Sequence, residues 1–205
     1  MAVLPMFPLG TVLLPGAFLP LHVFEPRYRS LVHDCLAGTP EFGVALIERG
    51  SEVGGGDARF DVGCVAHIVE AGQLPDGRFA LATVGTRRIR VGAWLPDDPY
   101  PRAEIEDWPD PPAEQGDGER IEAVTTELRR VLALAAEVGA APPAAAVEIS
   151  DDPVAASYQL AAHAPVGPLD RLALLAAPGV RARVDGVATM LDDAATLLAS
   201  RLDGG

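Results

Sequence analysis

Lysine is absent from this chain of 205 residues, and all 16 of its basic side chains are arginine. These face 29 aspartates and glutamates, so the formal net charge is -13. The negative surplus extends over both halves of the sequence and repels the phosphates of nucleic acids and of anionic lipids. We therefore expect neither a nucleic acid nor a membrane among the partners of this protein.

Cysteine is nearly absent too, since Cys35 and Cys64 are the only two. Two cysteines are too few for a disulfide framework, and we expect both to be reduced in a cytoplasmic protein. The histidines do not stand at metal-ligand spacing from a cysteine or a carboxylate. They are His22, His33, His67 and His163. The sequence therefore predicts no metal site.

Enzymatic motifs are missing as well. A Walker phosphate-binding loop and a serine–lysine catalytic dyad both require lysine. The serines lack the Gly-x-Ser-x-Gly pattern of a nucleophile elbow. The glycine-rich residues 50–57 lack a dinucleotide-binding fingerprint and predict a flexible connector. We expect no catalytic residue, no cofactor and no enzymatic activity.

A run of carboxylates between residues 97 and 110 raises the question of a hard cation. It consists of Asp97, Asp98, Glu104, Glu106, Asp107 and Asp110. The run lacks the spacing of a calcium-binding loop, so we interpret it as a solvated strand edge and loop.

Long apolar runs are also missing. Pro5, Pro8, Pro15 and Pro20 interrupt the apolar N-terminal segment, and no basic residue precedes Arg27. This pattern predicts neither a signal peptide nor a membrane span.

The best-marked local signal that is present lies in residues 18–36, where an apolar strand runs directly into a helix. Pro26 suits the first helical turn, because its missing N–H is not needed there and its φ is already helical. Apolar residues then recur at helical spacing, and Gly38 follows as a C-cap. They are Tyr28, Leu31, Val32, Cys35 and Leu36. A helix with one apolar face predicts a sheet or barrel for it to cover.

Short apolar or alternating runs predict that sheet. The predicted strands are residues 42–47, 62–70, 79–84, 87–94 and 102–108. Pro75 and Gly77 predict a hairpin turn that pairs residues 79–84 with 62–70. Alternation in the later strands predicts inward and outward sides. Ile89, Val91, Ala93, Ala103 and Ile105 are predicted inward, and Arg88, Arg90, Trp94, Arg102, Glu104, Glu106 and Trp108 outward.

The second half of the chain has a different period. A proline-rich stretch at residues 109–112 precedes a change from a period of two to a period of 3.6. Helices are predicted at 118–138, from Pro153, from Pro168 and at the C-terminal end, with a linker at 140–146. We predict two domains, residues 1–112 and 113–205.

Ordered motifs across the chain resemble the N-terminal, substrate-binding domain of Lon proteases. They are Met6-Phe7-Pro8-Leu9, Leu19-Pro20-Leu21, Phe24-Glu25-Pro26-Arg27-Tyr28, Phe42 to Ile47, Val62-Gly63-Cys64-Val65-Ala66, Leu74-Pro75-Asp76-Gly77-Arg78-Phe79, Val84 to Arg88 and Ser157-Tyr158-Gln159-Leu160. The resemblance implies an α+β fold, a PUA-like β pseudo-barrel with one packed helix followed by a C-terminal α-helical bundle. In the family this region recognises substrates, while ATP hydrolysis and proteolysis lie further along the chain. Here it implies a stand-alone form without those domains.

The leading hypothesis is a non-enzymatic module that binds unfolded or apolar polypeptide, or one specific protein partner. The candidate contacts are aromatic and surround the cleft expected between the two domains. They are Phe18, Phe24, Tyr28, Trp94 and Trp108. One alternative is a regulatory subunit that docks on a Lon-type ATP-dependent protease.

Another alternative is RNA binding through the arginines of residues 87–90, which are the one basic cluster in the sequence. The negative net charge opposes this alternative. An ion pair of Arg90 with Glu104 or Glu106 on a solvent-facing strand is the simpler interpretation.

Overall fold

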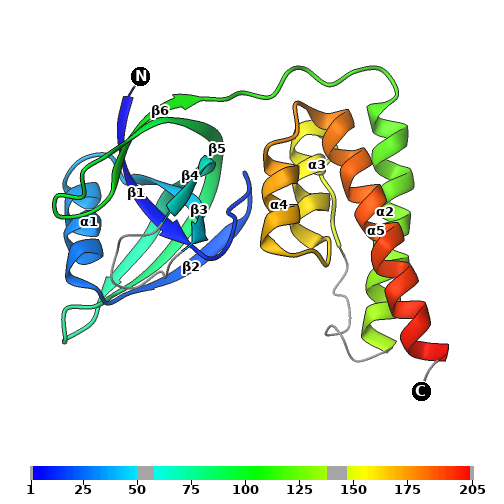
Figure 1. Ribbon diagram of the computed structural model, residues 1–205, viewed down its shortest axis with the longest axis horizontal. Coiled ribbons are helices and arrows are strands. Elements are labelled where there is room, and N and C mark those ends of the chain that lie inside the picture. Colours follow the sequence, from blue (N-terminus) through cyan, green and yellow to red (C-terminus); the bar gives the residue numbers. More distant parts are fainter. Residues whose placement is uncertain (1, 50–57, 138–146, 204–205) are drawn as a thin grey trace. The chain divides into compact units, whose positions relative to one another are not determined.

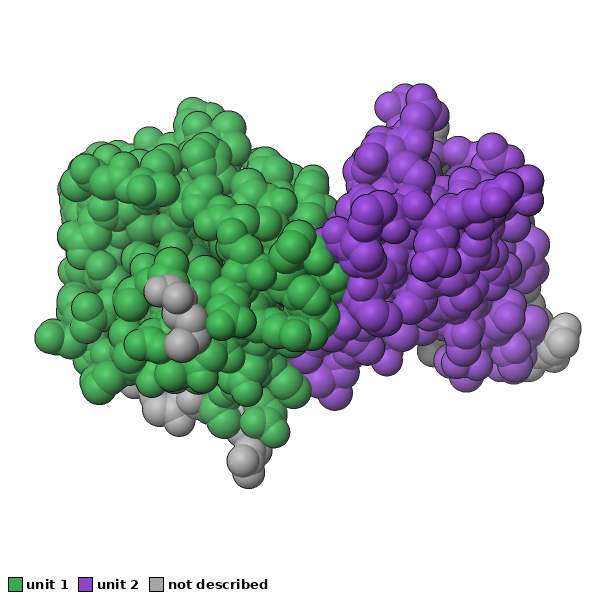
Figure 2. Space-filling model, turned by 90° about the horizontal axis from the view of Figure 1, so that it is seen from above, with its two compact units in different colours: residues 1–109 green, residues 110–205 purple. Residues whose placement is uncertain are grey.

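The computed structural model describes residues 2–49, 58–137 and 147–203. Contacts divide the chain into two compact units, residues 1–109 and 110–205 (Figure 2). The domain boundary at residues 112 and 113 stays a prediction. Two predicted segments, the connector at 50–57 and the linker at 140–146, lie outside the described residues.

The first unit is a mixed α+β structure (Figure 1). Its elements are β1 (Ala2–Leu9), β2 (Phe18–Val23), α1 (Pro26–Ala37), β3 (Glu41–Arg49), β4 (Ala58–Gln73), β5 (Phe79–Leu95) and β6 (Arg102–Asp107). The strand order is β2-β5-β4-β3-β1-β6, and β6 pairs with β5 in addition. This extra pairing closes five of the strands into a ring. β1 and β3 are parallel, while the other pairs are antiparallel.

β5 is the strand that gives β2 its position. Residues 79–84 of β5 pair with β2, and residues 89–95 pair with β6. β2 therefore extends from the first half of β5, beside the closed ring. The predicted strands 79–84 and 87–94 form this one continuous strand. The hairpin turn at Pro75 and Gly77 is confirmed, with Gly77 at φ 79°, although β5 residues 79–84 pair with 67–73 of β4.

α1 begins at Pro26 and ends before Gly38, as the sequence predicts. Tyr28, Leu31, Val32 and Cys35 are buried in a core that they share with the barrel strands. The rings of Tyr28 and Phe7 stack with centroids 4.0 Å apart. Leu36 was predicted on this face but is exposed, because it lies at the margin of the buried stripe.

The alternation predicted for β5 is wrong at two positions. Arg88 is buried and Ala93 is exposed, although the pattern places them the other way round. The register between β5 and β6 shifts between Val91 and Ala93. Such a bulge adds a residue to one strand and moves the following side chains, including Ala93, to the opposite face. Arg88 precedes the shift and is buried because the Trp108 ring lies 4.2 Å from its guanidinium and the Trp108 carbonyl accepts its hydrogen bond.

The second unit is helical. Its elements are α2 (Asp117–Glu137), α3 (Pro153–His163), α4 (Pro168–Leu175) and α5 (Val180–Asp203). α2 and α5 pack along one another, and α3 packs on both. The start of α3 is as predicted, since the Asp152 side chain accepts a hydrogen bond from the Ala155 N–H at 2.8 Å.

Candidate functional site

The candidate site lies along β2 in the first unit. Leu19 and Leu21 pack against the barrel core, while Phe18, Pro20 and His22 are exposed. Phe24, directly after the strand, is exposed as well. The phenyl groups at the two ends of β2 keep 63% and 54% of their accessible surface. β2 thus presents one apolar row to the core and a second row to solvent.

A hollow of about 220 Å³ adjoins β2. Its walls come from β1, β2 and the start of α1. They are Phe7, Leu9, Pro20, Leu21, His22, Val23, Phe24, Glu25 and Tyr28. Pockets for drug-sized ligands usually measure about 300–1,000 Å³. The hollow is smaller, and its size suits one or two side chains of a larger partner. We call the exposed row of residues 18, 20, 22 and 24 together with this hollow the β2 surface.

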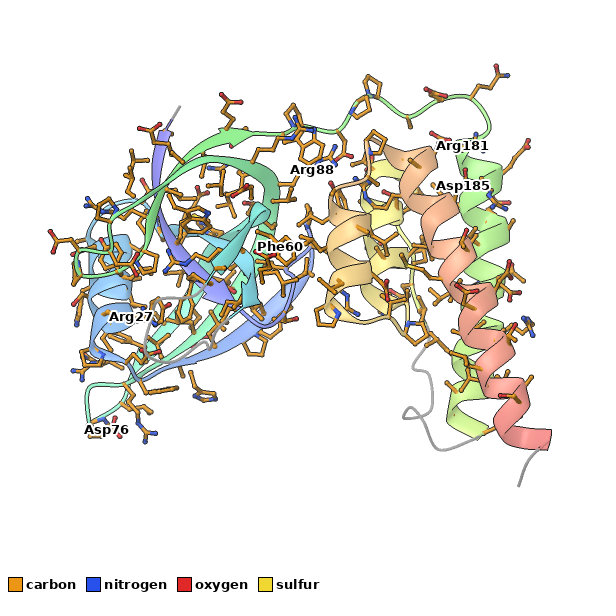
Figure 3. The ribbon with its side chains drawn as sticks, viewed as in Figure 1. Arg27, Phe60, Asp76, Arg88, Arg181 and Asp185 are labelled. Atoms are coloured by element: carbon orange, nitrogen blue, oxygen red, sulfur yellow. The ribbon has the colours of Figure 1, made fainter. Side chains whose placement is uncertain are left out.

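The side chain of Tyr28, which lines the hollow, is held in place by its neighbours. Tyr28 is only 2% exposed, and its ring is fixed between the stacked ring of Phe7 and the guanidinium of Arg27, 4.4 Å from its centroid. Arg27 also donates to the Glu25 carboxylate at 3.1 Å. Tyr28 is therefore part of the core and of the floor of the hollow. Figure 3 shows Arg27 on α1, in the same unit.

The two tryptophans named from the sequence lie elsewhere. Trp94 is half-buried, its Nε1–H donates to Asp61 at 3.3 Å, and the Arg59 guanidinium lies 4.8 Å from its ring. Trp108 is half-buried as well, with the guanidinium carbons of Arg88 and Arg90 at 4.2 and 3.6 Å from its ring. Neither tryptophan lines the hollow. The structure brings Phe24 and Tyr28 together at the hollow, and Phe18 lies at the other end of β2.

The arginines of residues 87–90 make contacts within the first unit. Arg87 donates to Glu41 and to Asp107, each at 2.9 Å. These hydrogen bonds raise the pKa of the Arg87 guanidinium against the opposing effect of burial. Arg88 is buried and donates to the Trp108 carbonyl at 2.8 Å. We therefore do not propose nucleic-acid binding through this cluster.

The carboxylate run is divided between several partners. Asp97 accepts from Arg59 at 3.1 Å, and Asp107 accepts from Arg87. Asp110 was predicted to be solvated, but its carboxylate pairs with the fully buried guanidinium of Arg183 at 2.7 Å. That part of the prediction is wrong because the partner stands 73 positions away in the sequence. Among the residues that the structure describes, no cluster of side chains is suited to a metal ion.

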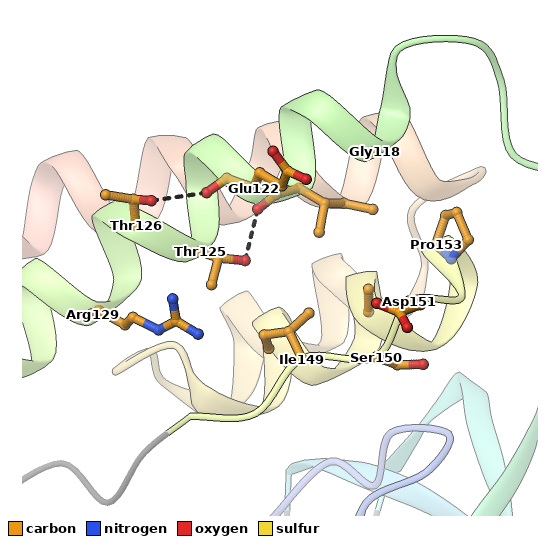
Figure 4. Close-up of a pocket in the computed structure, with 11 residues that line it drawn as sticks. Gly118, Glu122, Thr125, Thr126, Arg129, Ile149, Ser150, Asp151 and Pro153 are labelled. Carbon is orange, nitrogen blue, oxygen red and sulfur yellow. Dashed lines mark hydrogen bonds between the residues drawn. The ribbon is translucent and has the colours of Figure 1, made fainter.

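Two further hollows lie among the described residues of the second unit. The hollow in Figure 4, about 390 Å³, lies between α2 and the segment that enters α3. Thr125 and Thr126 donate to carbonyls of their own helix, and Arg129 donates to the Val147 carbonyl. The other hollow, about 410 Å³, contains the ion pair of Arg181 with Asp117. Because these groups bond within the unit, they do not define a ligand.

Both thiols are buried, and neither lies in the candidate site. Burial, with the charge of Asp34, raises the pKa of the Cys35 thiol from 9.0 to about 12. Burial also raises the pKa of the Cys64 thiol to about 12, although hydrogen bonds with the backbone oppose this rise. The folded state therefore keeps both groups neutral.

We expect the two thiols to resist a disulfide reagent at pH 8 in the native protein and to react in urea, because only the exposed thiolate attacks. The same shifts predict a dependence of stability on pH. Their contribution is complete below the ordinary thiol pKa of 9.0 and is lost as the pH rises from there towards 12. Urea titrations at several alkaline pH values measure this loss.

The double variant Cys35→Ala/Cys64→Ala is the control, and its stability should fall less steeply over the same range. Tyr100 adds a similar loss of stability, which begins near pH 10, because burial and its hydrogen bond to Asp34 raise its pKa from 10.0 to about 12. Rapid labelling of the folded wild type at pH 8 would contradict the burial of the thiols.

The helices described in the structure include none that is long and apolar enough to cross a membrane. The fold and the β2 surface together define an α+β protein with a barrel unit, a helical unit and a hollow beside the exposed row of β2.

The family follows from comparison with known proteins. Residues 3–193 match the model of the ATP-dependent protease La (LON) substrate-binding domain, and the chain belongs to this family. Lon protease 1 of Herpetosiphon aurantiacus is 30% identical over 193 residues, which cover 89% of this chain but 23% of that protein. The chain thus spans about a quarter of the length of this curated relative.

Solved structures support the fold. A Lon N-terminal domain protein from Xanthomonas campestris has 27% identity and a TM-score of 0.67, covering 92% of this chain and 98% of its own. The N-terminal domain of a Mycobacterium avium complex Lon protease has 21% identity and a TM-score of 0.65, covering 94% and 99%. The predicted family and the α+β fold class are confirmed.

Sequence reasoning missed Pro20 and His22 as part of the candidate site. A proline inside a strand was the available signal, because proline cannot donate to a sheet and favours edge strands. The residues of β1 that form the hollow have no signal in the sequence, since they reach β2 only through the barrel topology.

Proposed function

We propose that this chain binds polypeptide segments with apolar side chains and that the β2 surface of the first unit is where they bind. The observation that carries the proposal is the pair of exposed phenyl groups, Phe18 and Phe24, at the ends of a strand beside an apolar hollow. Membership of a substrate-binding family supports a polypeptide as the ligand. The chain acts in this proposal as a recognition module without catalysis of its own.

The magnitudes agree with a weak, general interaction. Full burial of a phenylalanine side chain yields about 1.5–3 kcal/mol. Phe18 and Phe24 are each little more than half exposed, so together they provide only part of the free energy of binding. Backbone contacts and the hollow have to provide the remainder. Binding in the micromolar range corresponds to about -8 kcal/mol and suits a module that takes up many segments and releases them.

The direct test uses an array of 12-residue peptides from an unrelated protein, followed by fluorescence anisotropy with the strongest binder. Phe18→Ser and Phe24→Ser should each weaken that binding by about tenfold, because each removes an anchoring ring. The matched control is Leu169→Ser in α4, which changes a side chain of similar exposure, 65%, in the other unit.

The control should leave the affinity unchanged within about twofold, and all variants should unfold at the wild-type urea concentration. Equal weakening by Leu169→Ser, or no weakening by either phenylalanine variant, would place the binding surface elsewhere. If no peptide binds while a single folded protein is retained from the cell extract, general polypeptide recognition is wrong.

A further inference from the structure

The direction of the backbone groups in β2 can be derived from its contacts with β5. The Gly85 N–H donates to the Ala17 carbonyl at 2.9 Å, and the Thr83 hydroxyl donates to the Leu19 carbonyl at 2.7 Å. In an antiparallel pair, alternate residues direct both N–H and C=O towards the partner strand. Ala17, before the strand, faces β5 with its carbonyl alone, because its N–H donates to the Leu14 carbonyl. Within β2, residues 19, 21 and 23 therefore face β5, and residues 18, 20 and 22 face away from it.

The opposite edge of β2 carries an unusual set of groups. β2 stands at the end of the strand order, and within the described ranges β5 is the strand that pairs with it. The edge presents the N–H groups of Phe18 and His22 and the carbonyls of Phe18, Pro20 and His22. Pro20 lies on the edge side, where its lack of an N–H leaves the ladder with β5 intact. A sheet edge of this kind is a template for another strand.

We propose that the polypeptide adds to this edge of β2 as an extended strand, with alternate side chains entering the adjoining hollow. This inference rests on the proposed function and adds the geometry of the ligand. The six residues of β2 match a segment of about the same length, roughly 20 Å. Main-chain hydrogen bonds provide affinity for many sequences, and the hollow selects apolar side chains.

Charge indicates which segments bind best. Residues 1–109 contain 9 arginines and 14 acidic residues. Close to β2, Arg27 is already paired with Glu25, and Arg78 with Asp76. Glu70 is exposed on β4, and the register aligns it with Ala82 of β5 and through it with Pro20. The occupant that fits is an extended apolar segment with basic residues at its ends.

The backbone of β2 is tested with a matched pair of variants at one position. His22→Pro removes an edge-facing N–H, while His22→Ala keeps it and removes the same exposed side chain. With the array peptide of the preceding section, we expect His22→Pro to bind at least tenfold more weakly than His22→Ala, whose own loss of affinity measures the contribution of the side chain alone. Equal affinities of the two variants would overturn strand addition.

The peptide itself provides a second test that does not depend on how the variants fold. Methylation of single backbone nitrogens should weaken binding at every second residue, because only alternate amides face β2. A helical ligand would instead lose affinity at nearly every position beyond its first turn, because each interior N–H donates within the helix, and a disordered contact would show no period. Either of these results would overturn the inference.

Lysine or glutamate at the peptide ends tests the choice of occupant. The lysine form should bind more tightly, and the difference should shrink at high salt. Equal or tighter binding of the glutamate form would contradict the predicted charge. If wild-type protein binds no array peptide, the proposed function fails as a whole. If peptides bind and Phe18→Ser weakens their binding, but methylation shows no loss at every second residue, the proposed function stands and strand addition is wrong.

Discussion

Replacement of Arg183 by methionine should destabilise the helical unit by about 3–5 kcal/mol, because removal of one partner of a buried ion pair leaves the other charge uncompensated. Arg183 is fully buried and donates to Asp110 at 2.7 Å, to the Ser157 hydroxyl at 2.7 Å and to the Leu174 carbonyl at 3.1 Å. The Tyr158 hydroxyl donates to the same carboxylate at 2.6 Å. One side chain thus joins α5 to α3 and to the start of the unit.

The control for this variant is an exposed ion pair in the same unit. Arg120 donates to Asp185 at 2.8 Å, and both side chains are well exposed. Arg120→Met should cost at most about 1 kcal/mol. Urea unfolding followed by circular dichroism at 222 nm measures both, since the helices dominate this signal. A loss for Arg183→Met no larger than for Arg120→Met would show that the buried network is dispensable.

The double variant Arg183→Met/Asp110→Asn removes both charges. It should recover part of the lost stability, because a neutral amide is less costly to bury than an unpaired carboxylate. A further loss in the double variant would assign the effect of the single variant to packing.

Local signals in the sequence predicted the elements of the fold that depend on neighbouring residues. The start of α1 at Pro26, the turn at Gly77 and the cap at Asp152 are all as predicted. Each depends on the conformational preference of a few residues in a row. The family resemblance added the barrel, which periodicity alone does not specify.

Features that depend on distant residues were missed. The exposure of Ala93 follows from a bulge between β5 and β6, and the burial of Arg88 follows from its contacts with Trp108, 20 positions away. The buried pair of Asp110 and Arg183 joins positions 73 residues apart. Neither feature leaves a pattern within one strand or helix, so a single sequence contains no signal for it.

The candidate site shows the same division. Helical spacing placed Tyr28 on the apolar face of α1, but no pattern decides whether Phe24, just before the helix, is buried or exposed. The structure exposes Phe24 and buries Tyr28 against Phe7. The exposure of the β2 edge depends on β5, whose residues 79–84 pair with β2 and whose residues 89–95 pair with β6. Binding through these residues stays a prediction.

Gly85 controls the position of β2, and Gly85→Ala should destabilise the barrel unit by about 1–3 kcal/mol through overpacking. A Cβ at this position would collide with the carbonyl of Leu14, which is backbone and cannot rotate away. The Gly85 N–H also donates to Ala17, and its carbonyl accepts from the Gly16 N–H at 2.8 Å. These bonds hold the segment that enters β2.

The control for Gly85 is Gly72→Ala in β4, where the nearest neighbour of an added Cβ is the Ala80 carbonyl at 3.9 Å. Both tryptophans of the chain, Trp94 and Trp108, lie in the barrel unit, so urea unfolding followed by tryptophan fluorescence reports on that unit. Gly85→Ala should lower the fluorescence midpoint, leave the transition at 222 nm near that of the wild type and weaken peptide binding. Gly72→Ala should change none of these. If Gly85→Ala lowers the fluorescence midpoint but the folded variant binds peptide with full affinity, binding does not depend on the position of β2. That result would contradict the β2 surface as the binding site.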